Sequence, residues 1–144
     1  MRRMRRQRLA FKGGVALDGP VILAIEGHGL EAGGLSIKPT LVGLRQCSGL
    51  DFVFLRINSF DGLRRHLRDW AERASQAVGL LCLSFHGGPG VILIGRRKVT
   101  LKEIARCIGP VVGDRAVLFS SCSTLSAPNR SLIEFRKTTG IKIM

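Results

Sequence analysis

Two residues of this chain carry the side chains of a nucleophile and its base, and each one follows an apolar run. His86 follows Leu80–Phe85 (LLCLSF), and Cys122 follows Arg115–Ser120 (RAVLFS) after one further serine. A thiol is a good nucleophile only as the thiolate, and an adjacent imidazole lowers its pKa through ion pairing. The pair therefore predicts nucleophilic catalysis, with Cys122 as the nucleophile and His86 as the general base, provided that the fold brings the two runs together.

Gly87 suits the same chemistry because it follows His86 and has no side chain to block a substrate carbonyl. Its backbone N–H and that of Cys122 would form an oxyanion hole, in which the loss of one donor typically costs about 3 kcal/mol of barrier. Two plainly structural roles stay open beside this one. A histidine after a strand often serves only as a turn residue, and a cysteine between two serines can simply begin a helix.

Strands and helices are expected to alternate, because short apolar runs alternate with segments of helical periodicity. The expected strands are Val21–Ile25, Asp51–Ile57, Leu80–Phe85, Val91–Ile94, Arg115–Ser120 and the start of another at Ile141–Met144. The expected helices are Pro39–Cys47, Asp61–Ala77, a segment opened by a Thr100–Glu103 capping box and ending near Ile108, and Ser131–Thr139. A cluster of turn residues covers His86–Gly90.

This alternation predicts an α/β fold, with a mostly parallel sheet between helices in a three-layer α/β/α sandwich. Residues that act on ligands in such sheets lie beyond the carboxyl ends of the strands. Three of the expected strands end on chemically capable residues: Glu26 and His28, then His86, then Cys122. The fold is therefore expected to bring these residues to one edge of the sheet.

Charge divides the chain into two parts, a basic arm over residues 1–20 and one α/β domain over residues 21–144. The net charge is +13, and the arm holds Arg2, Arg3, Arg5, Arg6 and Arg8. Such an arm is typically solvated and disordered, and it could contact nucleic acid non-specifically through phosphates. Lys12 and Asp18 interrupt the apolar stretch that an export signal requires.

The cysteines and histidines predict neither a metal site nor a cofactor. Cys47, Cys82, Cys107 and Cys122 are irregularly spaced and form no CxxC pair or Cys/His cluster. Reduced cysteines in a chain without an export signal indicate a cytoplasmic location. The sequence also lacks the run of about 18 apolar residues that a membrane-spanning helix needs.

Two motifs give a family resemblance. Leu83–Gly87 (LSFHG) followed by Leu118–Ser123 (LFSSCS) resembles the His-Gly and Cys motifs of caspase-like cysteine peptidases. This clan includes caspases, gingipains, separases and bacterial CHAT domains. The likeness covers about residues 21–144 and is greatest to a small bacterial caspase-like family, through IEG at 25–27, FHG at 85–87, Gly95, SCSTL at 121–125 and TG at 139–140.

The resemblance implies a hydrolase, specifically a cysteine endopeptidase acting on peptides or proteins. It gives His86 the role of general base and acid, Cys122 that of nucleophile, and the amides of Gly87 and Cys122 that of oxyanion hole. Glu26, at the end of the first strand, would line the substrate pocket and favour cleavage after Lys or Arg. Glu26 could equally accept a hydrogen bond from a backbone amide.

The resemblance also implies a sheet of about six strands, whereas this chain ends inside what should be the fifth strand of that sheet. We therefore expect the sheet to lack its last strands, and we expect a protein partner or a second copy at the open edge. The alternative function is a non-catalytic basic α/β module that binds nucleic acid or a protein.

Overall fold

The computed structural model describes residues 9–10, 16–17, 21–33, 35–73, 79–111, 115–121 and 123–143. The strands are β1 Leu9–Ala10, β2 Ala16–Leu17, β3 Val21–Gly27, β4 Asp51–Ile57, β5 Leu80–Ser84, β6 His86–Gly88, β7 Val91–Ile94, β8 Arg97–Thr100, β9 Ala116–Ser120 and β10 Lys142–Ile143. The helices are the 3₁₀-helix η1 Leu30–Gly33 and the α-helices α1 Lys38–Ser48, α2 Phe60–Arg73, α3 Leu101–Ile108 and α4 Asn129–Thr139.

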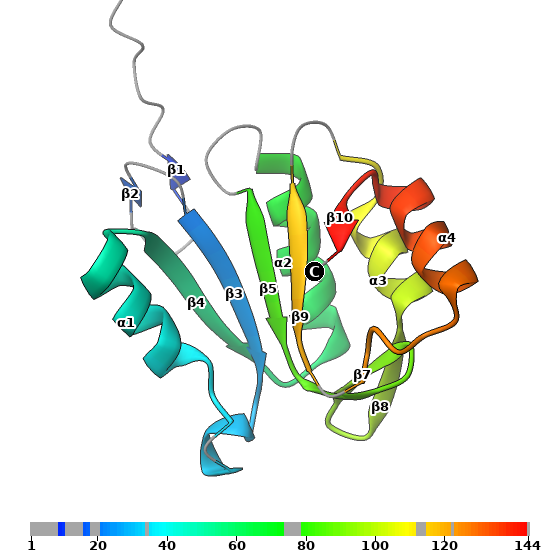
Figure 1. Cartoon of the computed structure of the whole chain (residues 1–144), viewed down its shortest axis with the longest axis horizontal. Coiled ribbons are helices and arrows are strands. Elements are labelled where there is room, and N and C mark those ends of the chain that lie inside the picture. Colours follow the sequence, from blue (N-terminus) through cyan, green and yellow to red (C-terminus); the bar gives the residue numbers. More distant parts are fainter. Residues whose placement is uncertain are drawn as a thin grey trace, which may run out of the picture.

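The centre of the molecule is a parallel sheet with the strand order β4-β3-β5-β9-β10 (Figure 1). This sheet, flanked by helices, confirms the predicted α/β class and is compatible with the three-layer α/β/α arrangement. A separate antiparallel unit, β6-β7-β8, follows β5, and β1 pairs with β2 within the predicted basic arm. The arginines of that arm at positions 2, 3, 5, 6 and 8 lie outside the described residues.

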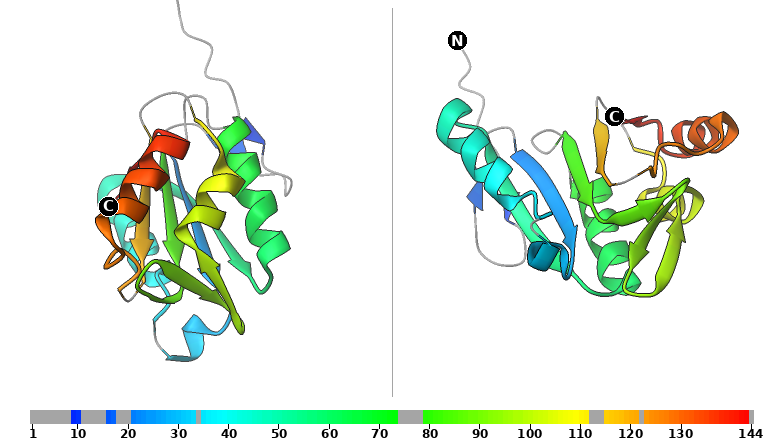
Figure 2. Two further views of the ribbon diagram at one scale, coloured as in Figure 1. Left: turned by 90° about the vertical axis from the view of Figure 1, so that its right-hand side faces the viewer. Right: turned by 60° about the horizontal axis from the view of Figure 1, so that its bottom comes forward.

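The two faces of the sheet are covered unequally, as Figure 2 shows. Leu23 and Ile25 of β3 belong to the larger core, which also holds Leu67 of α2, Ile104 of α3 and Phe135 of α4. Ile22 and Ala24, which alternate with them along β3, belong to a smaller core together with Leu41 of α1 and Cys82 of β5. Because side chains alternate along a strand, one face packs against three helices and the other packs against α1.

Local sequence explains where several elements begin and end. Thr100 caps α3, since its hydroxyl accepts from the Glu103 backbone N–H while the Glu103 carboxylate accepts from the Thr100 backbone N–H. This is the predicted capping box, and it satisfies backbone donors that a helix start leaves unpaired. The αL conformation of Gly140 ends α4, where its N–H donates to the Arg136 carbonyl.

Two expectations about the strands are wrong. The segment expected as a turn, His86–Gly90, contains the strand β6, because its backbone pairs with Val91–Leu93 of β7 and only Pro89 and Gly90 form the turn. The other is Arg115–Ser120, whose apolar run is typical of a buried strand, because the observed strand, Ala116–Ser120, leaves Leu118 36% exposed. Leu118 lies on the face that carries α1, and α1 packs over β3 and β4 rather than β9.

No helix among the residues described above has the length and apolar character needed to cross a membrane.

Candidate functional site at the carboxyl ends of the strands

The register of the sheet brings three strand ends to one level. Glu26 on β3 is paired with Ser84 on β5, and Ser84 is paired in turn with Ser120 on β9. The chain order also reverses here, since β4 lies on one side of β3 and β5 lies on the other. In open α/β sheets, ligands bind outside the carboxyl ends of the strands at such a reversal. His28 follows β3 and His86 follows β5, the strands on either side of this reversal, and both histidines are exposed.

The Glu26 side chain is fully buried, and its carboxylate is surrounded by donors. One oxygen accepts from the Arg56 guanidinium at 3.1 Å. The other accepts from the Ser36 hydroxyl at 2.8 Å and from the Ile37 backbone N–H at 2.9 Å. A buried carboxylate needs such partners, because burial of an unpaired charge is very costly.

Two features of the fold explain this network. Arg56 is directly opposite Glu26 in the β3–β4 register, so both side chains lie on the same face of the sheet. Ile37 precedes α1, and the start of a helix favours a negative charge. Glu26 therefore links two strands and the start of a helix. It accepts a hydrogen bond from the Ile37 backbone amide, which was the structural role that the sequence analysis offered beside the substrate pocket. At 0% exposure, it presents no surface to a substrate in this structure.

His86 begins β6, and its backbone position is fixed by the hairpin that follows β5. It pairs with Leu93, and Gly87 pairs with Ile92. Phe85, immediately before it, is buried in the larger core while His86 is exposed. The chain thus anchors one residue in the core and exposes the next at the end of the sheet.

Gly27 makes room for that anchor. A Cβ at this position would lie 2.9 Å from Cδ1 of Phe85 and 3.3 Å from its Cε1. Contacts under 3.0 Å essentially never occur for real Cβ atoms, so any side chain at position 27 must displace the phenyl ring. The glycine at the end of β3 therefore sets the place of Phe85, and through it that of His86.

Cys122 lies outside the described residues. The residues around it form a loop that is tied to the hairpin. The Thr124 hydroxyl donates to the Val91 carbonyl at 3.0 Å, and the Gly90 N–H donates to the Thr124 carbonyl at 2.9 Å. Ser123 has a φ of 60°, the positive value that non-glycine residues seldom adopt.

The described thiols differ in environment. Burial raises the pKa of Cys82 on β5 to about 11. Burial also raises the pKa of Cys107 on α3, against the opposing effect of Arg68 and Arg64. Cys47 is exposed on α1. A thiol held in its protonated form is a poor nucleophile, so neither Cys82 nor Cys107 suits that role.

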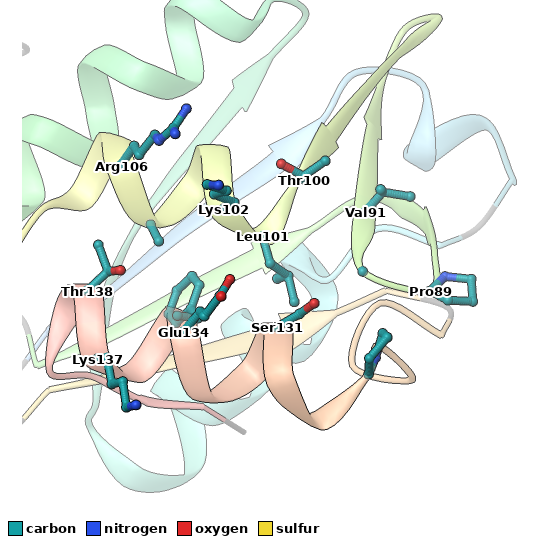
Figure 3. A pocket seen from close by; sticks show the side chains of 14 residues that line it. Pro89, Val91, Thr100, Leu101, Lys102, Arg106, Ser131, Glu134, Lys137 and Thr138 are labelled. Carbon is teal, nitrogen blue, oxygen red and sulfur yellow. The ribbon is translucent and has the colours of Figure 1, made fainter.

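A groove of about 630 Å³ lies beside the hairpin, between α3 and α4 (Figure 3). Leu101 of α3 lies between Glu134 and Ser131 of α4, and Pro89 and Val91 form one end. The groove contains neither His86 nor Glu26, so the strand ends and this groove are separate places on the molecule.

Sequence reasoning missed two interactions that shape this region. The first is the Arg56–Glu26 ion pair, which the sequence could have indicated because a charged residue inside an apolar strand needs a partner. The second is the hydrogen bond from the Gly90 N–H to the Thr124 carbonyl, for which the sequence carries no comparable sign, since both residues belong to polar, turn-rich segments. Among the described residues, no group of three or more His, Cys, Asp or Glu side chains could hold a metal ion.

Comparison with known proteins assigns no family. No protein-family model matches the chain, and no curated protein is significantly similar to it.

Proposed function

We propose that this chain is a cysteine hydrolase of the endopeptidase type, with Cys122 as the nucleophile and His86 as the base. The register of β5 and β9 carries the proposal. Ser84 and Ser120 are level neighbours, and His86 and Cys122 each follow their strand by two residues. Neighbouring strands are about 4.8 Å apart, so side chains that follow such ends can meet.

The proposed reaction has two halves. The Cys122 sulfur attacks the carbonyl carbon of a peptide bond and passes its proton to His86. The Gly87 and Cys122 amides hold the oxyanion that forms on the carbonyl oxygen. His86 then protonates the departing amine, which leaves a thioester on Cys122. Water, deprotonated by His86, hydrolyses this thioester and restores the thiol.

The backbone next to Cys122 supports the proposal. Ser123 is the single non-glycine residue with positive φ in the part of the chain that the structure describes. Backbone conformations of this kind cost roughly 1–3 kcal/mol and cluster at active sites. The hydrogen bonds of Thr124 to the hairpin hold this conformation in place, next to the hairpin that begins with His86.

The hydrogen bonds of Glu26 do not support the predicted preference for cleavage after Lys or Arg. That preference depended on a Glu26 carboxylate that faces the substrate, and this carboxylate already accepts hydrogen bonds from Arg56, Ser36 and Ile37. The proposal therefore leaves the substrate side chain open. It retains a cytoplasmic location, where a nucleophilic thiol stays reduced.

The test is the iodoacetamide alkylation rate of each cysteine, from about pH 5 to about pH 9, which brackets ordinary imidazole and thiol pKa values. Near pH 6, Cys122 should react at least about tenfold faster than the exposed Cys47, because paired thiols keep their thiolate at low pH. His86→Ala should abolish this advantage. Cys82 should be the slowest thiol, since burial raises its pKa to about 11.

His28→Ala is the matched control, because His28 is an exposed histidine at the neighbouring strand end. It should leave the Cys122 rate unchanged. If Cys122 reacts no faster than Cys47, and neither histidine variant matters, the chain holds no Cys–His pair and the hydrolase proposal fails. A rapid, His86-dependent Cys122 justifies a screen for peptide cleavage, with Cys122→Ala as the inactive reference.

One observation favours the alternative of a basic binding module. Arg96, Arg97 and Lys98 are all exposed at one corner of the β7–β8 hairpin. If the hydrolase proposal fails, non-specific nucleic-acid binding is the next candidate. Its affinity should fall steeply with salt, as expected for contacts with phosphates.

A further inference from the structure

The groove between α3 and α4, which measures about 630 Å³, has two unlike ends. Arg106 and Thr138 lie at one end, whereas Pro89 and Val91 lie at the other (Figure 3). Pro89 is exposed and Val91 is half-buried, so this second end presents an apolar surface. Ligand-binding clefts typically measure about 300–1,000 Å³ and combine an apolar surface with a few placed polar groups. The groove has the size and the chemical division of such a cleft.

The charges of this groove are mostly positive. Its lining includes Lys102 and Arg106 of α3 and Lys137 of α4, which are all exposed. Within the described part of the chain, none of these three cations forms a salt bridge. The carboxylate of Glu134 also lines the groove, but it is paired at 3.6 Å with Arg130, which lies outside the lining. The groove therefore favours an anionic ligand.

The spacing of two of these cations matches an extended polypeptide. Lys102 and Arg106 are four residues apart in α3, so they lie on the same side of the helix, about 6 Å apart along its axis. In an extended segment, side chains on one face recur every second residue, about 6.6 Å apart. Two carboxylates that are two positions apart can therefore meet Lys102 and Arg106 together, and Lys137 adds a third positive charge from α4.

The lining suits a peptide better than a nucleic acid. Proteins bind single-stranded nucleic acids largely through accessible aromatic side chains on which the bases stack. Phe135 lines the groove but is only 1% exposed, so it offers no face to a base. The Glu134 carboxylate would also repel a chain of phosphates, whereas the apolar end at Pro89 and Val91 suits an aliphatic side chain.

We propose that the groove between α3 and α4 binds a short acidic segment of another protein in an extended conformation. Two carboxylates of this segment meet Lys102 and Arg106, and an aliphatic side chain rests against Pro89 and Val91. Hydrogen bonds from cations to carboxylates are about twice as strong as those between neutral groups. The inference goes beyond the hydrolase proposal and does not depend on Cys122.

A suitable probe is a fluorescent peptide of about seven residues, with glutamate at its third and fifth positions, leucine at each end and serine elsewhere. The two leucines allow the peptide to bind in either direction. Fluorescence anisotropy follows its binding to the full chain. We expect saturable binding to the wild type, and binding about tenfold weaker when Lys102→Gln and Arg106→Gln are combined, because two ion pairs are then lost.

Three comparisons separate this groove from the general positive charge of the chain. Lys137 and Arg136 are exposed neighbours on α4, and of the two only Lys137 lines the groove. Lys137→Gln should therefore weaken binding about threefold, whereas Arg136→Gln should leave it unchanged. Glu134→Gln should strengthen binding about threefold, because it removes a negative charge from the lining. A peptide of the same composition with adjacent glutamates should bind more weakly, since adjacent side chains of an extended segment point to opposite faces.

Four outcomes would overturn the proposal. Failure of the wild type to bind the probe would show that the groove takes no such segment. Equal weakening by Lys137→Gln and Arg136→Gln would assign the binding to general charge, and equal binding of the adjacent-glutamate peptide would remove the extended arrangement. A single-stranded oligonucleotide that displaces the peptide, with the same dependence on Lys137, would assign the groove to nucleic acid. Alkylation of Cys122 is a separate measurement, so each proposal can fail alone.

Discussion

The carboxyl ends of β3 and β5 begin from similar sequences and differ in structure. Each strand is apolar, carries a polar residue at its last or next-to-last position, and leads to a histidine followed by glycine. At the end of β3, the polar group is Glu26, which is buried and bound to Arg56, Ser36 and Ile37. At the end of β5, His86 is exposed beside a loop tied to the hairpin. We call these the closed end and the open end.

The difference shows that a polar residue after a strand is not by itself a sign of function. The closed end uses its charge to hold three segments of the chain together. The open end keeps its histidine exposed and uses hydrogen bonds of neighbouring residues for stability. A group that is already satisfied cannot serve a ligand as well, so the open end is the better candidate for chemistry.

The largest expected effect comes from breaking the closed end. Glu26→Ala should lower the free energy of unfolding by about 3 kcal/mol, because the Ser36 hydroxyl and the Ile37 amide lose their acceptor and Arg56 loses its buried ion-pair partner. His86→Ala should change it by less than about 0.5 kcal/mol, as is usual for an exposed position. Urea denaturation of both variants measures the contrast. Equal losses would remove the distinction between the two ends.

An intermediate effect is expected where the two ends meet, at Gly27. Gly27→Ala should cost about 2 kcal/mol, since the new Cβ would collide with the Phe85 ring and overpack the core. The control is Gly43→Ala in α1, where a Cβ meets nothing within 4 Å. That change should stabilise the helix by roughly 0.5–1 kcal/mol. Opposite signs in urea denaturation are expected, and a neutral Gly27→Ala would refute the role of this glycine.

The smallest of these three losses is expected for a hydroxyl near the open end, that of Thr124. Thr124→Val keeps the shape of the side chain but removes the hydroxyl, which donates to the Val91 carbonyl and shares a hydrogen bond with the Ser121 hydroxyl. The loss should be about 1.5 kcal/mol, since one hydrogen bond typically contributes about 0.5–1.5 kcal/mol net. The control is Thr138→Val on α4, because Thr138 is exposed and its hydroxyl makes no comparable hydrogen bond among the described residues, so this change should leave the free energy of unfolding nearly unchanged. Thr100→Val would not serve, because Thr100 also caps α3. A loss as large as that of Glu26→Ala would mean that the open end is built as rigidly as the closed one.

Much of the fold could be predicted from local patterns. Asp51–Ile57 is the predicted strand, because its aromatic and β-branched residues favour no competing structure. The capping box of α3 was predictable, since it depends on two residues three positions apart. The β6 strand was not, because glycine and proline indicate a turn and only pairing with β7 makes His86–Gly88 extended.

The parts of the site that could not be predicted depend on contacts between distant segments. The state of Glu26 depends on Ser36 and Arg56, which are 10 and 30 residues away. The exposure of Leu118 depends on which helices cover each face, and an apolar strand looks the same with one face covered or two. The predicted pairing of Cys122 with His86 remains a prediction that alkylation can test.

The unequal covering of the sheet also has a consequence for the order in which the molecule opens. Leu41 is the buried residue of α1, whereas α3 buries Leu101, Ile104, Ala105, Cys107 and Ile108. Local opening requires less free energy where fewer apolar contacts must be broken. The amides of α1 should therefore exchange with solvent through brief detachment of this helix, while those of α3 wait for the whole domain to unfold.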